Sequence, residues 1–195
     1  MNDQIFETVI TTCSPEGAVH VAPMGVRYVG EEVVLKPFRP SRTLDNVLAT
    51  RTAVLNTITD VRVFAGCVTG RRNWSTSTVD TPDGSPAVGL ACAHVHVLLR
   101  LVDVAEDPQR PTLRLARVRE VQRSAFPGFN RAQAAVLEGA VLVSRLHLLP
   151  PEKIDSEMAY LQIAVDKTAG AAELEAWTWL REAIARHRAP ALGSA

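Results

Sequence analysis

A cluster of basic and hydroxyl side chains stands between a predicted strand and a predicted helix in the first quarter of the chain. Lys36, Arg39 and Arg42 lie close together in sequence, and Ser41 and Thr43 stand among them. Guanidinium groups bind phosphate oxygens through two parallel N–H groups, and short hydroxyls add further donors. Because the start of a helix also offers backbone N–H groups, this stretch predicts a binding site for phosphate or another anion.

Ser41 and Thr43 also have an ordinary structural interpretation. Either residue is a good N-cap for the helix predicted over 44–49, since a hydroxyl oxygen can accept a hydrogen bond from an N–H of the first turn. Capping and anion binding therefore both remain open for these two hydroxyls. Asn46, one turn into the helix, is expected on the same side as Arg42 or Thr43.

A second unusual stretch, Pro23-Met24-Gly25, falls between two apolar alternations at 18–22 and 26–29. Proline lacks the N–H that a sheet ladder uses, and glycine lets a ligand or another backbone approach closely. The tripeptide therefore predicts an interrupted strand. The interruption is either a bulge or corner of a sheet, or the place where backbone groups meet a ligand.

The composition is that of an ordinary globular protein. Of 195 residues 47% are hydrophobic and 22% are charged, and the formal net charge is zero, so no nucleic-acid partner is expected. The three cysteines, Cys13, Cys67 and Cys92, are scattered without a CxxC pair and indicate no zinc site. No secretion signal is evident and no apolar run approaches about 20 residues, so we expect a cytoplasmic protein without a membrane partner.

His94 and His96 stand two positions apart in the segment 88–104, whose alternation predicts one long strand. Both rings would project from the same face of that strand, as the ligands of a zinc ion can. No third ligand follows at close spacing, so a half-buried strand with polar neighbours is the preferred interpretation, and no metal site is predicted. The polar stretch 70–86 before it is expected to be a loop.

The remaining pattern divides the chain into a β part and an α part. Strands are predicted over 4–12, 18–22, 26–29, 33–38, 53–57, 61–68, 88–104 and 112–122, and helices over 130–149, 152–165 and 171–188. The apolar stripe is expected at Ala134, Leu137, Val141 and Leu148 in the first of these helices, and at Trp177, Leu180 and Ile184 in the third. We therefore expect an α+β chain with one domain at 1–125, a helical region at 126–190 packed on it, and a frayed tail at 191–195.

Five short motifs, spread from the first strands to the C-terminal helices, form one set. They are Val21-Ala22-Pro23-Met24-Gly25-Val26, Lys36-Pro37-Phe38, Ser41-x-Thr43-x-x-Asn46, Gly128-Phe129-Asn130-Arg131-Ala132 and Ser144-Arg145-Leu146. Together they resemble the DUF447 group of FMN-binding split-barrel flavoproteins, and the resemblance runs through nearly the whole chain. It departs at Leu44, where relatives often carry an aromatic residue. The resemblance implies a six-stranded antiparallel split β-barrel with an appended helical region, and FMN bound at a homodimer interface.

On this resemblance, the residues expected to bind FMN are Pro23, Met24, Gly25, Lys36, Arg39, Ser41, Arg42, Thr43 and Asn46. The interrupted strand would offer backbone groups to the isoalloxazine, and the basic cluster would hold the phosphate. The expected function is that of a flavoprotein, an oxidoreductase that transfers hydride at the flavin to an unidentified small molecule. The alternative is a non-catalytic flavin-binding or dimeric scaffold protein, and no catalytic residue is assigned. Asn130 is expected to cap a helix, and Arg131 either reaches the flavin site or is solvated.

Overall fold

The computed structural model describes residues 4–189, and the tail predicted at 191–195 lies outside them. The chain forms two compact units. The barrel unit comprises the residues up to Thr59 together with 73–126, and the helical unit comprises 60–72 together with the chain from Pro127. Each unit has a core of its own, and the two are described in turn.

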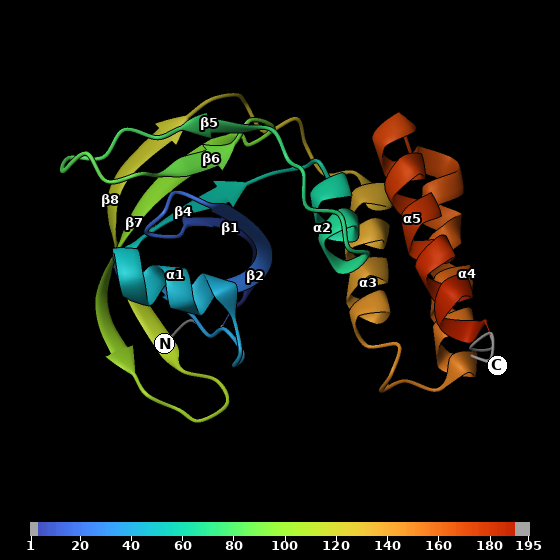
Figure 1. Cartoon of the computed structure of the whole chain (residues 1–195). Coiled ribbons are helices and arrows are strands. Elements are labelled where there is room, and N and C mark those ends of the chain that lie inside the picture. Colours follow the sequence, from blue (N-terminus) through green and yellow to red (C-terminus); the bar gives the residue numbers. More distant parts are fainter. Residues whose placement is uncertain (1–3, 190–195) are drawn as a thin grey trace. The chain divides into compact units, whose positions relative to one another are not determined.

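The barrel unit contains the strands and one helix. Six strands close into an antiparallel barrel in the order β1-β2-β3-β8-β7-β4. They are β1 (Phe6–Cys13), β2 (Val19–Val29), β3 (Glu32–Leu35), β4 (Thr52–Thr57), β7 (Val95–Ala105) and β8 (Thr112–Gln122). β5 (Thr76–Thr78) and β6 (Val88–Leu90) form a separate two-stranded sheet. The six-stranded antiparallel β-barrel that the resemblance implied is confirmed (Figure 1).

Alternate residues of the barrel strands point inward and form the core. Its members include Ile10, Val26, Val33, Leu35, Leu55, Val97, Leu99, Leu113 and Leu115. The helix α1 (Arg42–Thr50) adds Leu44 and Val47 to the same cluster. Burying an aliphatic side chain of this size stabilises a fold by about 1.5–3 kcal/mol. The apolar side of α1 is therefore what holds this helix against the barrel.

The short sheet β5–β6 covers part of the outer surface of β4 and β7. A small cluster joins the two layers: Val54, Val79, Ala87 and Leu98. His96 lies beneath β6, is only 2% exposed, and forms a hydrogen bond of 2.8 Å between its Nε2 and the carbonyl of Leu90. Gly89 leaves room for the ring, because a Cβ at this position would lie 2.4 Å from His96 Nε2.

One predicted strand is wrong, and another is divided into two. The segment 61–68 forms the helix α2 (Arg62–Val68), and the Asp60 carboxylate accepts a hydrogen bond from the first N–H of this helix at 3.1 Å. Its apolar residues alternate over so few positions that they fit a helix as well as a strand. The segment 88–104 is divided into β6 and β7 by a turn at 91–94, where the N–H of Ala93 donates to the carbonyl of Leu90.

Pro23, Met24 and Gly25 do not interrupt β2, contrary to the prediction. They pair in unbroken register with residues 7–9 of β1. β3 pairs with β2 only from Val26 onward, so the tripeptide lies where β1 alone is paired with it. The missing N–H of Pro23 therefore costs no ladder bond on the β3 side.

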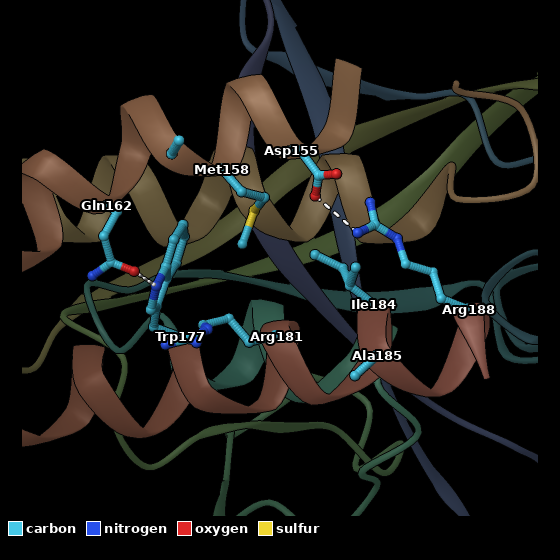
Figure 2. A pocket seen from close by; sticks show the side chains of 9 residues that line it. Asp155, Met158, Gln162, Trp177, Arg181, Ile184, Ala185 and Arg188 are labelled. Carbon is cyan, nitrogen blue, oxygen red and sulfur yellow. Dashed lines mark hydrogen bonds and ion pairs between the residues drawn. The ribbon is translucent and has the colours of Figure 1, made fainter. Parts of the chain in front are cut away.

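The helical unit consists of α2 with α3 (Arg131–Ser144), α4 (Pro151–Thr168) and α5 (Ala171–Arg188). The three predicted C-terminal helices are thus present, and Trp177, Leu180 and Ile184 form the buried face of α5 as predicted. The Nε1 of Trp177 donates to Gln162 of α4 at 2.7 Å (Figure 2). None of the helices within residues 4–189 has both the length and the apolar character of a membrane span.

The predicted stripe of α3 is wrong. The buried residues are small or short instead: Ala132, Ala135, Val136, Gly139, Ala140 and Val143. They let α5 approach closely, since a Cβ at Gly139 would lie 3.0 Å from side-chain atoms of Leu180 and Trp177. α3 also ends at Ser144, earlier than the predicted residue 149.

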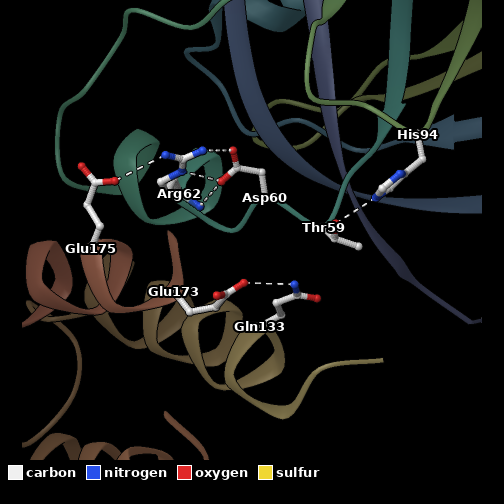
Figure 3. A network of polar contacts seen from close by, with 7 residues as sticks. All are labelled: Thr59, Asp60, Arg62, His94, Gln133, Glu173 and Glu175. Atoms are coloured by element: carbon white, nitrogen blue, oxygen red, sulfur yellow. Dashed lines mark hydrogen bonds and ion pairs between the residues drawn. The ribbon is translucent and has the colours of Figure 1, made fainter. Parts of the chain in front are cut away.

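Polar contacts join α2 and α3 to α5 (Figure 3). The Arg62 guanidinium donates to Asp60 at 2.7 Å and to Glu175 of α5 at 3.5 Å. Asp60 above all, with Glu175 in addition, raises the pKa of Arg62 above its ordinary value. Gln133 of α3 donates to Glu173 of α5 at 3.0 Å. The contact between Arg62 and Glu175 is one of those that join α2, although distant in sequence, to the helical unit.

Candidate functional site

The start of α1 carries the predicted basic and hydroxyl residues. Ser41 is the N-cap, and its Oγ accepts a hydrogen bond from the N–H of Leu44 at 3.3 Å. The N–H groups of Arg42 and Thr43 have no hydrogen-bond partner within the described residues, as is usual in the first turn of a helix. Two backbone donors therefore remain for an anion at this end of α1. Of the two capping candidates Ser41 is confirmed, whereas the Thr43 side chain is buried.

The three cations of the cluster have different surroundings. Arg39 is fastened to the turn between β7 and β8, because its Nη2 lies 2.8 Å from Glu106 and its N–H donates to the carbonyl of Gln109 at 2.8 Å. The Arg42 side chain is exposed and forms no hydrogen bond or ion pair with the part of the chain that the structure describes. Lys36 is half-buried. Arg42 and Lys36, rather than Arg39, are thus the cations available to a ligand.

The β7–β8 turn contributes a cation that no sequence pattern indicated. Arg110 Nε donates to the carbonyl of Lys36 at 2.9 Å, and its guanidinium lies 4.5 Å from the centre of the Phe38 ring. The Asp107 carboxylate shapes the turn, accepting hydrogen bonds from the N–H groups of Arg110 at 2.6 Å and Gln109 at 2.8 Å. These two bonds lower the pKa of Asp107. The turn therefore positions the backbone that leads into α1.

The structure brings some of the predicted residues of β2 and α1 together. Met24 packs against the core cluster that contains Leu44 and Val47 of α1. Asn46 of α1 donates from Nδ2 to the Thr12 hydroxyl of β1 at 2.9 Å. Met24 and α1 therefore contribute to the same core cluster, and Asn46 joins α1 to β1.

Pro23 and Gly25 alternate with Met24 along β2 and so lie on the opposite face of this strand. Gly25 has a structural explanation there, since a Cβ would lie 2.8 Å from the side chain of Ile5. What a ligand could use at these positions is the backbone, because residues 22–25 are paired by β1 on one side only.

His94 and His96 have separate partners. The ring nitrogens of His94 form hydrogen bonds with the hydroxyls of Thr59 at 2.8 Å (Figure 3) and Ser124 at 2.7 Å, and His96 is held by the carbonyl of Leu90. Within residues 4–189, no group of three or more His, Cys, Asp and Glu side chains could hold a metal ion.

The chemistry of these donors suits a phosphate group at the start of α1. Two N–H groups, the Arg42 guanidinium and the Lys36 ammonium can donate to its oxygens, and the positive end of the helix dipole adds to the attraction. Asp45 is the acidic residue of the first turn and is exposed, so it offsets part of this charge. The balance at the start of α1 remains positive.

Comparisons with known proteins place this arrangement in a family. The model described as "Protein of unknown function (DUF447) N-terminal domain" matches residues 6–124, and the model described as "Protein of unknown function (DUF447)" matches residues 130–182. Among curated proteins no match was found.

Solved structures share the fold. The FMN-bound DUF447 protein MM1853 from Methanosarcina mazei is 23% identical with a TM-score of 0.80, and the match covers 93% of this chain and 96% of that one. The 2-nitrobenzoate 2-nitroreductase NbaA of Pseudomonas fluorescens is 16% identical with a TM-score of 0.52, covering 63% and 66% of the two chains. Flavoredoxin from Methanosarcina acetivorans is 11% identical with a TM-score of 0.51, covering 63% and 74%.

The two family models account for the barrel unit as well as most of α3, α4 and α5. The motifs of β2 and α1 that resembled the family in the sequence lie inside the first matched range, and Asn130-Arg131-Ala132 and Ser144-Arg145-Leu146 lie inside the second. The chain belongs to the DUF447 family.

Proposed function

We propose that the chain is an FMN-binding flavoprotein that holds the phosphate of FMN at the start of α1. The observation that carries this proposal is the pair of N–H groups, of Arg42 and Thr43, that have no partner within the described residues and lie at the same helix end as the Arg42 side chain. A phosphate dianion matches such donors and the dipole of α1. Family membership supports the choice of ligand, since the DUF447 protein of Methanosarcina mazei is described as FMN-bound.

The other predicted residues would hold the remainder of FMN. Residues 22–25 of β2 would offer backbone groups to the edge of the isoalloxazine, because only β1 pairs with them. Asn46 would keep α1 in place through its hydrogen bond to Thr12. Lys36 and Ser41 would contribute to the phosphate site, whereas Arg39 would have to exchange its ion pair with Glu106 before it could do so.

The activity that follows is that of an oxidoreductase acting on a small molecule. FMN, when bound, supplies the capacity to accept and donate hydride. The residues of the chain would bind and orient it, and no side chain is assigned an acid–base role. The names of the nitroreductase and the flavoredoxin with similar folds support this class of activity.

We also propose that the protein is a homodimer formed through the barrel unit. Residues 22–25 of β2 are paired by β1 on one side only, and apolar side chains are exposed on the same unit, among them Val19 at 45% and Phe38 at 64%. Open strand edges and apolar surface favour association, and most homo-oligomers close by two-fold symmetry. A second copy could then complete the cofactor site.

The cytoplasm is the proposed location. Cys13, Cys67 and Cys92 all lie within the described residues and form no disulfide. Cysteines that form no disulfide are typical of proteins in reducing compartments.

The phosphate site is tested by comparing FMN with riboflavin, which lacks the phosphate. In a Lys36→Ala/Arg42→Ala variant the affinity for FMN should fall by at least about 100-fold, since each charged contact contributes about 1.5–3 kcal/mol. The affinity for riboflavin should be unchanged. Arg119→Ala removes an arginine of β8 that is paired with Asp80, and should leave both affinities unchanged. Equal losses for FMN and riboflavin would place the phosphate elsewhere.

A further inference from the structure

A hollow of about 530 Å³ lies between α4 and α5 in the helical unit (Figure 2). The two helices are tied together at both ends of it. At one end Trp177 of α5 donates to Gln162 of α4 at 2.7 Å, and at the other end Arg188 of α5 donates to Asp155 of α4 at 2.8 Å. Between these two contacts the helices leave the space open.

The walls of the hollow are mostly apolar. Figure 2 shows Met158 of α4 and Ile184 of α5 pointing into the space between the helices. The small side chains of Ala159 and Ala185 also line it, and Trp177, which is 3% exposed, closes one end. Well-packed protein interiors leave few voids larger than a water molecule, whereas small-molecule sites measure about 300–1,000 Å³. The hollow is open to solvent, and its volume falls within the range of small-molecule sites.

The charged and polar groups around the hollow are paired with one exception. Asp155 and Arg188 form an ion pair. The amide nitrogen of Gln162 donates to Asp166 at 2.7 Å, and its amide oxygen accepts the hydrogen bond from Trp177. Arg181 lines the same hollow and forms no hydrogen bond or ion pair with any residue in the described part of the chain. Its guanidinium is thus available to an anion, and a carboxylate fits it through two parallel N–H groups.

We propose that this hollow binds a small organic carboxylate with an apolar body. The carboxylate pairs with Arg181, and the apolar body lies along Met158 and Ile184. The flexible thioether of Met158 adapts well to an apolar ligand. One available cation among apolar walls suits a monoanion better than a phosphate, and the positive charge opposes a cationic ligand. Every residue involved belongs to α4 or α5, so the proposal stands independently of FMN binding.

The test is a two-dimensional NMR titration of the purified full-length chain with three ligands of equal length: sodium octanoate, octan-1-ol and octylammonium chloride. Octanoate should shift backbone signals of α4 and α5 around the hollow and bind at least about tenfold more tightly than octylammonium, the ratio expected for one charged hydrogen bond. Equal affinity for the three ligands, or shifts confined to other elements, would overturn the proposal.

A pair of variants tests the role of the guanidinium. Arg181→Gln should weaken octanoate binding by about tenfold, because it removes the charged contact, and should leave octan-1-ol binding unchanged. Arg186→Gln is the matched control, since Arg186 stands on the same helix, does not line the hollow, and lies 3.9 Å from Glu182. It should leave all three affinities unchanged. The same effect from both variants would contradict a carboxylate site at Arg181.

Discussion

At the scale of single residues, the buried amide side chain of Asn56 connects three strands of the barrel unit through hydrogen bonds. Asn56 of β4 is fully buried, and its Nδ2 donates to the carbonyls of Val9 at 3.0 Å and Val54 at 3.1 Å. Its oxygen accepts a hydrogen bond from the N–H of Leu90 at 2.7 Å. One side chain therefore joins β4 to β1 and to β6.

Replacing this residue, Asn56→Ala, should destabilise the protein strongly. The N–H of Leu90 and the carbonyl of Val9 would lose a partner while buried, and each such loss costs about 1–3 kcal/mol. We expect the free energy of unfolding in urea to fall by about 2–5 kcal/mol. Asn73→Ala changes an exposed asparagine and should alter the free energy of unfolding by less than about 0.5 kcal/mol. Similar losses in both variants would show that the buried hydrogen bonds contribute little.

A second residue makes stability depend on pH. The N–H groups of Arg110 and Gln109 lower the pKa of Asp107 in the folded state. Its stabilising contribution is therefore complete above the unfolded pKa of about 3.9 and is lost as the pH falls through the lower folded value. Asp107→Asn should unfold at lower urea concentration than the wild type at neutral pH, and the difference should shrink as the pH falls from about 5 to about 2. If the difference in stability between variant and wild type stayed constant over this pH range, the ionised Asp107 carboxylate would not be what stabilises the fold.

Single residues also show how far the sequence predicts the candidate site. The cluster from Lys36 to Thr43 is visible because its members are neighbours in the chain, and the capping role of Ser41 follows from its type and place. Glu106 and Arg110, in contrast, approach the cluster from 67 and 74 positions away. Only the pairing of β3 with β8 brings that turn beside the start of α1, so no local pattern could indicate it.

At the scale of elements, β8 and α5 were predicted with their bounds, whereas α2, the break between β6 and β7 and the end of α3 were not. β8 at Thr112–Gln122 and α5 at Ala171–Arg188 match the predicted bounds, because each contains several periods of its pattern. The seven residues of α2 do not distinguish a strand from a helix. The break between β6 and β7 was missed because Ala91, Cys92 and Ala93 continue an apolar stretch through the turn.

The contact between β6 and β7 leads to a prediction of its own. Gly89→Ala should lower the free energy of unfolding by about 1–3 kcal/mol, the usual range for overpacking, because the new Cβ would collide with the ring of His96. The loss should be smaller when the substitution is made in a His96→Ala background, where the ring is absent. Urea denaturation of the two single variants and the double variant measures this coupling. If the losses in the free energy of unfolding were additive, the Cβ at position 89 would not clash with the His96 ring.

At the scale of the whole molecule, the proposed homodimer can be tested directly. Sedimentation equilibrium at micromolar concentration should give twice the mass of the chain. Val19→Lys places a charge on the part of β2 that only β1 pairs with, and should shift the protein toward monomer. Leu174→Lys changes an apolar residue of the helical unit that is 51% exposed, and should leave the dimer intact. A wild-type monomer would contradict the proposal.

The division of the chain into a domain at 1–125 and a helical region packed on it stays a prediction. Its boundary follows the change from strand to helix patterns near Pro127. The segment 60–72 shows why composition alone does not decide such boundaries, because α2 packs with α3 and α5 although it lies between strands in sequence.

The central claim, that this chain is an FMN-binding protein, is tested most directly by its visible absorption spectrum together with the mass of the chromophore released on denaturation. We predict the spectrum of an oxidised flavin and a released compound with the mass of FMN rather than FAD. Bleaching of that spectrum by NADH, NADPH or a reduced deazaflavin would then identify the electron donor and separate an enzyme from a carrier. A colourless protein that takes up no FMN when FMN is added would contradict the claim.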